Sequence, residues 1–181
     1  MAIPVPRWKF TVGDYERMGE AGILGPDDRV ELVDGEVVEM APIGSRHAAC
    51  VNRVNRLLSD RTGNLAVVSV QNPIRLGDLS QPQPDLALLV PRADYYASHH
   101  PEVADVLLVV EVSWSTGAYD RLVKMPLYAR HGVRQSWLVD LDGGSVELYR
   151  PGQVPEIVTG AGPVPVDALP DLVLTAEDIL A

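Results

Sequence analysis

The stretch VLLVVEVS, residues 106–113, decides the fold of this chain, because seven of its positions suit a buried strand and one does not. A run this rich in valine and leucine is typical of a strand covered on both faces of a sheet. Glu111 interrupts the run, and an ionised glutamate is rarely buried without a partner. We therefore expect Glu111 to face a dedicated cation or to lie where the strand leaves the core.

The segments on either side offer partners for Glu111. PDLALLV, residues 84–90, predicts a second buried strand, with Pro84 at its start and Asp85 at its mouth. If these strands are neighbours, the carboxylates of Asp85 and Glu111 come close enough to bind one hard cation such as Mg²⁺. Such an ion would polarise a phosphoryl oxygen and help deprotonate a water nucleophile.

A helix is predicted over YDRLVKMPLYARHG, residues 119–132, with a kink or a late start at Pro126. Asp120, Lys124 and Tyr128 are spaced four apart and would share one face. Lys124 would then supply positive charge to the developing pentacovalent phosphate or orient the attacking water.

The first half of the chain predicts a helix, a hairpin and a second helix. Thr11 suits the N-cap of the first helix, and Asp34-Gly35 predicts a two-residue turn that places Glu31 opposite Val38. Ser45 is expected to cap a helix that ends near Gly63. One face of this helix carries His47, Val51, Val54 and Leu58. His47 is therefore expected to point toward the sheet.

The remaining segments complete a mixed α/β (α+β) fold. Residues 65–76 predict a strand broken at Pro73, and residues 91–105 a loop with room for one turn of helix. Residues 136–149 predict a strand, a turn and a strand. The Pro- and Gly-rich tail ends in a short helix that Thr175 would cap. This order predicts a mixed sheet with helices on its faces.

Each candidate residue also has a structural interpretation. Asp85 alone would be a turn residue after proline, and Glu111 could form a salt bridge with an arginine or with Lys124. His47 would be a hydrogen-bonded core histidine, and Glu31 a solvent-facing strand residue. The combination of all of them in one order is harder to explain by separate structural roles.

Composition limits the function classes. The 181 residues fit a single domain over 1–181. The net charge of −10 argues against tight nonspecific DNA binding. A local basic stripe would depend on four candidates, Arg46, Arg53, Arg56 and Arg61. The single cysteine, Cys50, is expected in the core, and the absence of a signal peptide or a long apolar run predicts a cytoplasmic protein with no membrane segment.

Taken in order, four blocks of the sequence resemble the Uma-type restriction endonuclease family of the PD-(D/E)xK nuclease superfamily, over roughly residues 10–178. The blocks are VELVDGEVVEMAPIGSRHAACVNRVNRLL, PQPDLALLV, VLLVVEVSWST and YDRLVKMPLYARHGVRQSWLVD. The resemblance implies a restriction-endonuclease-like αβββαβ core and phosphodiester hydrolysis with Mg²⁺, or with Mn²⁺ in its place. It further implies DNA as the substrate and a homodimer.

Carried over residue by residue, the resemblance assigns the PD aspartate to Asp85 and the acidic residue of the second motif to Glu111. The motif lysine is absent, because Ser113 stands at its position. The resemblance instead implies that the lysine lies on the following helix, as Lys124. Supporting positions are Glu31, His47 and, on the strand before PD, Gln71.

Two function classes therefore remain open. The first is an Mg²⁺-dependent DNA endonuclease that uses Asp85, Glu111 and Lys124, with Glu31, His47, Gln71, Asp120 and Tyr128 in support. The second is a catalytically inactive or repurposed nuclease fold with an interaction or regulatory role, which the net charge and Ser113 favour. Hydrolysis of a small phosphoester is a third, without a motif of its own.

Overall fold

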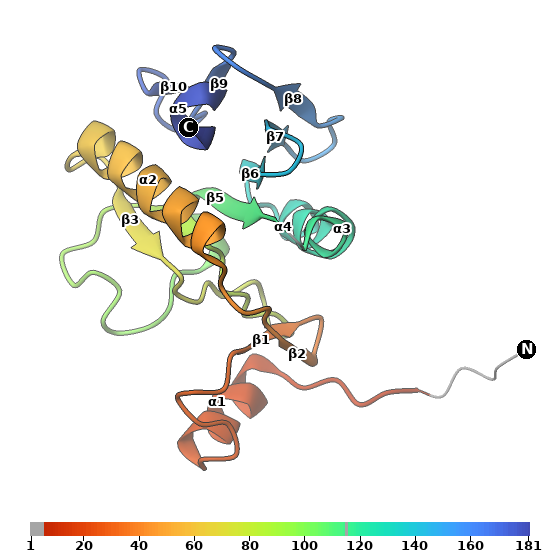
Figure 1. The fold of residues 1–181 in the computed structure, drawn as a ribbon. Coiled ribbons are helices and arrows are strands. Elements are labelled where there is room, and N and C mark those ends of the chain that lie inside the picture. Colours follow the sequence, from red (N-terminus) through yellow and green to blue (C-terminus); the bar gives the residue numbers. More distant parts are fainter. Residues whose placement is uncertain (1–5, 115) are drawn as a thin grey trace, which may run out of the picture.

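A six-stranded mixed sheet organises the chain, whose residues 6–114 and 116–181 are described by a computed structural model (Figure 1). The strand order is β3-β4-β5-β6-β7-β8, in which β5 and β6 are parallel and the other neighbours are antiparallel. The strands are β3 (Val67–Val70), β4 (Leu86–Leu89), β5 (Val106–Ser113), β6 (Ser136–Asp140), β7 (Ser145–Tyr149) and β8 (Glu156–Val158).

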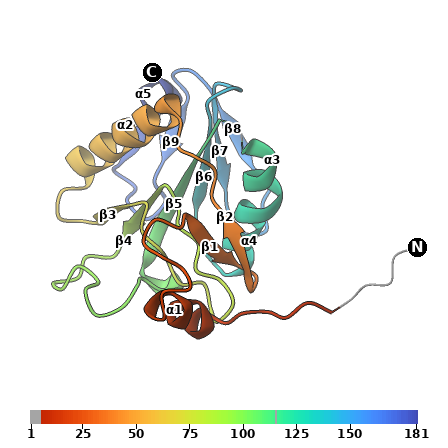
Figure 2. The same cartoon turned by 60° about the horizontal axis from the view of Figure 1, so that its bottom comes forward.

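Helices cover both faces of this sheet (Figure 2). The helix α2 (Ser45–Thr62) packs on one face, and a continuous helical stretch packs on the other. That stretch consists of α3 (Gly117–Tyr119), a π-helical segment (Asp120–Lys124) and α4 (Met125–Arg130). The order α2, β3, β4, β5, helix, β6 is the predicted αβββαβ core.

The alternation of side chains along β5 decides which helix Glu111 faces. Leu108, Val110 and Val112 belong to the core beneath α2, whereas Val109 belongs to the core beneath α4. Successive strand residues point to opposite faces, so Glu111 shares the α4 face with Val109. Both faces of β5 are covered, as its apolar pattern predicts.

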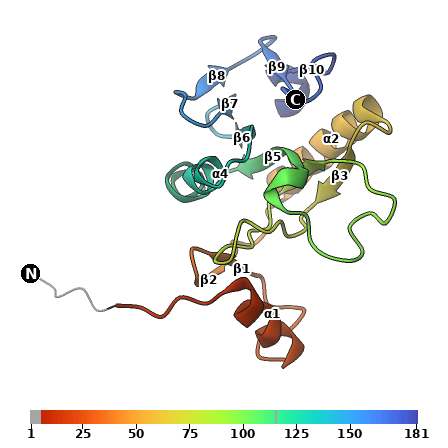
Figure 3. The ribbon, with the colours of Figure 1, turned by 180° about the vertical axis from the view of Figure 1, so that it is seen from behind.

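A hairpin and a helix lie at the end of the molecule opposite to the C-terminal elements (Figures 1 and 3). The helix is α1 (Val12–Glu20), and the hairpin consists of β1 (Val30–Val33) and β2 (Glu36–Glu39). Thr11 forms the predicted N-cap, within a capping box with Asp14. The predicted register is also confirmed, with Glu31 opposite Val38. Asp34 and Gly35 both have positive φ, as a two-residue turn of this type requires.

The C-terminal segment adds a small two-stranded sheet, β9 (Pro163–Pro165) with β10 (Val173–Thr175), and the helix α5 (Ala176–Leu180). Thr175 caps α5 as predicted. Cys50 is buried beneath α5, and burial raises the pKa of its thiol to about 11, as expected for a core cysteine. No described helix is both long and apolar enough to cross a membrane.

The prediction that Ser45 caps α2 is wrong. Ser45 is the first helical residue, and the N-cap is Gly44, which offers no side chain for a capping hydrogen bond. A glycine is needed there because a Cβ atom on Gly44 would lie 2.6 Å from Cζ3 of Trp114. Close packing of an indole ring against the backbone therefore overrides the capping preference.

Pro73 and Pro126 interrupt regular structure, as predicted. The strand β3 ends before Pro73, and Gln71 has a φ of 51°. Pro126 occupies the first turn of α4, after the π-helical segment. A wider turn accommodates the proline ring, which would otherwise clash with the preceding turn of a regular α-helix.

Candidate active site

Glu111 lies at the centre of a buried polar network and is 4% exposed. Its Oε1 accepts a hydrogen bond from the Tyr128 hydroxyl at 2.5 Å and lies 2.8 Å from Nζ of Lys124. Its Oε2 accepts the backbone N–H of Asp85 at 3.4 Å. Burial raises the pKa of Glu111 to about 8, and the positive charge of Lys124 opposes this shift.

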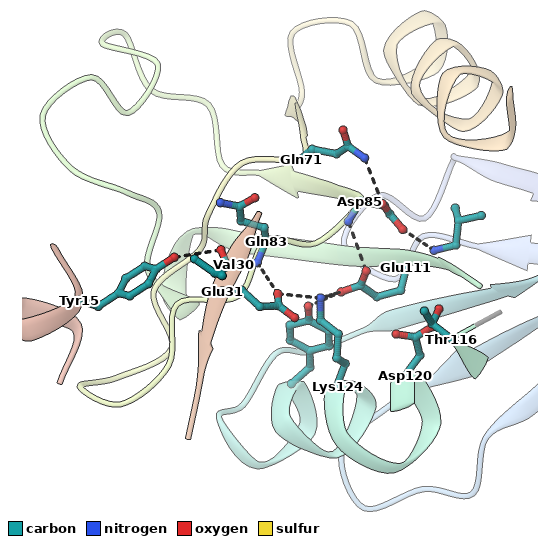
Figure 4. Close-up of polar contacts among 12 residues, drawn as sticks. Tyr15, Val30, Glu31, Gln71, Gln83, Asp85, Glu111, Thr116, Asp120 and Lys124 are labelled. Atoms are coloured by element: carbon teal, nitrogen blue, oxygen red, sulfur yellow. Dashed lines mark hydrogen bonds and ion pairs between the residues drawn. The ribbon is translucent and has the colours of Figure 1, made fainter. Parts of the chain in front are cut away.

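Lys124 is held between two glutamates (Figure 4). Its ammonium lies 3.1 Å from Oε2 of Glu31 as well as 2.8 Å from Glu111, and all three residues are less than 5% exposed. Although burial acts to lower the pKa of Lys124, the two carboxylates raise it above its ordinary value. The lysine therefore stays charged inside the protein.

The hairpin carries Glu31 to this position. An isolated pairing of Leu32 with Gln81 aligns β1 beside the segment that leads into β4. The backbone N–H of Gln83 then donates to Oε2 of Glu31 at 3.0 Å. Glu31 is consequently buried and paired, so the interpretation of Glu31 as a solvent-facing strand residue is wrong.

Asp85 forms the second half of the network, at the mouth of β4. Its Oδ2 accepts the backbone N–H of Val112 at 2.9 Å and lies 2.9 Å from Nε2 of His47. Gln71 donates to Oδ1 at 3.4 Å, and its backbone N–H donates to the carbonyl of Asp85 at 3.0 Å. The hydrogen bond to Asp85 raises the pKa of His47.

Asp120 lies in the same pocket but outside the hydrogen-bonded chain of the other residues (Figure 4). Its Oδ2 accepts the Thr116 hydroxyl at 2.6 Å. Burial raises its pKa. The helical spacing of four places Lys124 and Tyr128 against Glu111, whereas Asp120, at the start of the π-helical segment, is paired with Thr116 instead.

Most of these side chains, but not Gln71 or Tyr128, line a pocket with a volume of about 210 Å³. Five carboxylates and two permanent cations contribute to its walls, so the pocket carries excess negative charge. The charged residues are Glu31, Glu39, Asp85, Glu111, Asp120, Arg29 and Lys124. Within residues 6–114 and 116–181, no group of three or more His, Cys, Asp or Glu side chains forms a preassembled metal cage.

Comparison with known proteins identifies the family of this chain and a structure with the same fold. A family model described as "Uma2: Putative restriction endonuclease" matches residues 12–177. The chain belongs to the Uma2 family. A crystal structure described as "a putative nuclease belonging to DUF820" from Anabaena variabilis ATCC 29413 is similar to it, with a TM-score of 0.75 and 17% identity. The similarity covers 94% of this chain and 97% of the other, and it shows a shared fold. No curated protein matches.

Three residues that line the pocket of this Uma2-family chain were not identified from sequence patterns alone. They are Trp114, Thr116 and Tyr119. Tyr119 is notable because its hydroxyl is buried without a hydrogen-bond partner among the described residues. Burial raises its pKa to about 12. A tyrosine directly before the π-helical segment gives no periodic signal, so only the folded structure reveals it.

Tyr119, which lines the pocket, and Tyr128, which contacts Glu111, should respond oppositely to the loss of the hydroxyl group. Tyr128→Phe removes the hydrogen bond to buried Glu111 and should lower the free energy of unfolding by about 1.5–3 kcal/mol. Tyr119→Phe removes an unpaired buried hydroxyl and should leave that free energy unchanged or raise it. Urea denaturation of both variants beside the wild type measures the difference. A Tyr119→Phe variant that is the less stable of the two would contradict this hydrogen-bond assignment.

Proposed function

We propose that this chain is a divalent-metal-dependent endonuclease that hydrolyses phosphodiester bonds in DNA. The observation that supports it most is the meeting of Asp85, Glu111 and Lys124 in one pocket of a protein whose family is described as a restriction endonuclease family. Asp85 and Glu111 are the proposed metal ligands, and Lys124 is the third proposed catalytic residue.

The donor set fits a hard divalent cation. Asp85 and Glu111 offer carboxylate oxygens, and Mg²⁺ commonly takes one or two carboxylates and completes its shell with water and phosphate oxygens. Burial raises the pKa values of Glu111 and Asp120, and the carboxylates of the pocket outnumber its permanent cations. Mg²⁺, or Mn²⁺ in its place, would supply charge neutralisation at the scissile phosphate and a more acidic bound water when present.

The protein's own residues have separate roles in this proposal. Lys124 places a permanent positive charge beside Glu111, where it can stabilise charge that develops on the phosphoryl oxygens. Glu31 positions that ammonium from the other side. His47 and Gln71 orient the Asp85 carboxylate, and Tyr128 orients Glu111. Burial of these contacts strengthens them by excluding water.

Further parts of the proposal concern the setting of the reaction. We take residues 1–181 as one domain, working as a homodimer in the cytoplasm. Multi-angle light scattering of the purified protein would measure the mass of the particle in solution and so test the dimer.

A noncatalytic role is the second candidate, and one observation favours it. The residue two places after Glu111 is Ser113, which is 1% exposed and whose carbonyl accepts the N–H of Leu141. The lysine position of the superfamily motif therefore holds a buried, uncharged side chain here. In this case the network of Lys124 and its glutamates would serve stability alone.

A cleavage assay separates the two candidates. Supercoiled plasmid and short single- and double-stranded oligonucleotides are incubated with purified protein in Mg²⁺, in Mn²⁺ and in EDTA. The nuclease proposal expects cutting in Mg²⁺ or Mn²⁺ that EDTA abolishes. The absence of cutting on every substrate, or cutting that persists in EDTA, would reject it.

A further inference from the structure

The acidic pocket opens beside an apolar rim. Trp114 and Ile43 both line the pocket and remain 40% and 42% exposed. The rest of this rim is the loop that joins β2 to α2, residues 40–44, whose sequence MAPIG lines the pocket throughout. Exposed aromatic and aliphatic side chains beside a buried charged site are an apolar surface that requires an explanation.

Trp114 is held in place by two neighbours. It follows β5 directly, and its ring packs so closely against Gly44 that no Cβ atom could fit there. The guanidinium of Arg46 lies 5.5 Å from the centroid of the same ring. A tryptophan fixed in this way loses little conformational freedom when a flat ligand stacks on it.

The candidate basic stripe on α2 is poorly suited to follow the phosphates of a duplex. Of the four arginines of the candidate basic stripe on α2, Arg46 lies 3.7 Å from Asp142, and Arg56 pairs with Asp60. Arg53 donates to the carbonyl of Ile179. The chain as a whole carries a net charge of −10. Binding that depends on many phosphate contacts is therefore disfavoured, whereas base stacking needs no cations.

We propose that Trp114 and the 40–44 loop bind the base of an unpaired nucleotide, and that the substrate of the pocket is single-stranded nucleic acid. This inference rests on the proposed nuclease function, and it specifies the class of nucleic acid. Any base can stack on an aromatic side chain. The rim would therefore select for unpaired bases and not for a particular base sequence. The phosphate next to the stacked base would then face Lys124 and the two proposed metal ligands.

Fluorescence anisotropy tests this proposal. Labelled oligothymidylate, oligouridylate and a DNA duplex of matched length are titrated with protein in Ca²⁺ buffer. The wild type should bind the single strands more tightly than the duplex, and the first two probes separate DNA from RNA. Trp114→Ala should weaken single-strand binding by on the order of ten- to a hundredfold. Trp114→Phe should retain most of the affinity, because it keeps an aromatic ring.

The matched control is Trp8→Ala. Trp8 is 78% exposed but does not line the pocket, so its loss should not change the affinity. Thermal melts of all variants check that each one is folded. Unchanged single-strand binding by Trp114→Ala, tighter binding of the duplex by the wild type, or no binding of any probe would each overturn the inference.

The two proposals fail in different ways. If the wild type cuts nucleic acid but Trp114→Ala binds single strands normally, the rim site is wrong and the nuclease proposal stands. If the wild type binds single strands through Trp114 but cuts nothing, the rim site stands and the nuclease proposal is wrong.

Discussion

Replacing Lys124 by methionine should abolish nucleic-acid cleavage and lower the free energy of unfolding by about 3–5 kcal/mol. Methionine fills similar space but removes the only ammonium between Glu31 and Glu111 within the described residues. Glu31 and Glu111 are then buried without this cation, so each must keep an unpaired charge or take up a proton, and both outcomes destabilise the folded state. Urea denaturation measures the stability, and the cleavage assay on plasmid and on single- and double-stranded oligonucleotides measures the activity.

The other lysine of the chain provides the control. The sequence contains two lysines, and Lys9 pairs with Glu36 at 3.0 Å on the surface, where both side chains are more than 40% exposed. Lys9→Met should therefore cost at most about 1 kcal/mol and leave cleavage intact. Comparable losses of stability in the two methionine variants would show that the Lys124 network is not buried as described.

A double variant tests the charge argument itself. Glu31→Gln combined with Lys124→Met removes one of the two carboxylates left unpaired by the loss of the lysine. It should recover part of the stability lost by Lys124→Met without restoring cleavage. A double variant less stable than the single one would mean that packing, and not charge, dominates at this position.

Asp85→Asn should reduce cleavage by about a thousandfold or more, because a proposed metal ligand contributes several kcal/mol to the transition state. The amide keeps the size of the side chain, and its oxygen can still accept the N–H of Val112. The fold should therefore survive, which separates a catalytic role from a structural one. Cleavage rates and calorimetric titration with Mn²⁺ measure the two effects.

Asp78→Asn serves as the matched control for Asp85. Asp78 is 86% exposed at its side chain and pairs only with Arg75 among the described residues, so its replacement should alter neither cleavage nor Mn²⁺ binding. In the same titration, Glu111→Gln should remove Mn²⁺ binding as well. A full Mn²⁺ affinity in both Asp85→Asn and Glu111→Gln would place the ion elsewhere.

Local sequence patterns predicted most elements of the fold. The apolar run of 106–113, the Asp34-Gly35 turn and the caps Thr11 and Thr175 each depend on neighbouring residues alone, and all are confirmed. The cap of α2 was predicted wrongly because Trp114, far away in the chain, requires glycine at position 44. A contact between distant residues leaves no trace in a local pattern.

The sequence by itself determined that an acidic residue interrupts a buried strand, that a second one stands at the mouth of another, and that a lysine follows on a helix. Only the tertiary structure decided that Glu31 and Glu111 both hold Lys124, that Tyr119 has no hydrogen-bond partner among the described residues, and that Trp114 lines the rim. The physical reason is that hydrogen bonds and ion pairs act over a few ångströms. The side chains of Glu31 and Lys124, 93 positions apart, reach that range only after the sheet, hairpin and helices have packed together.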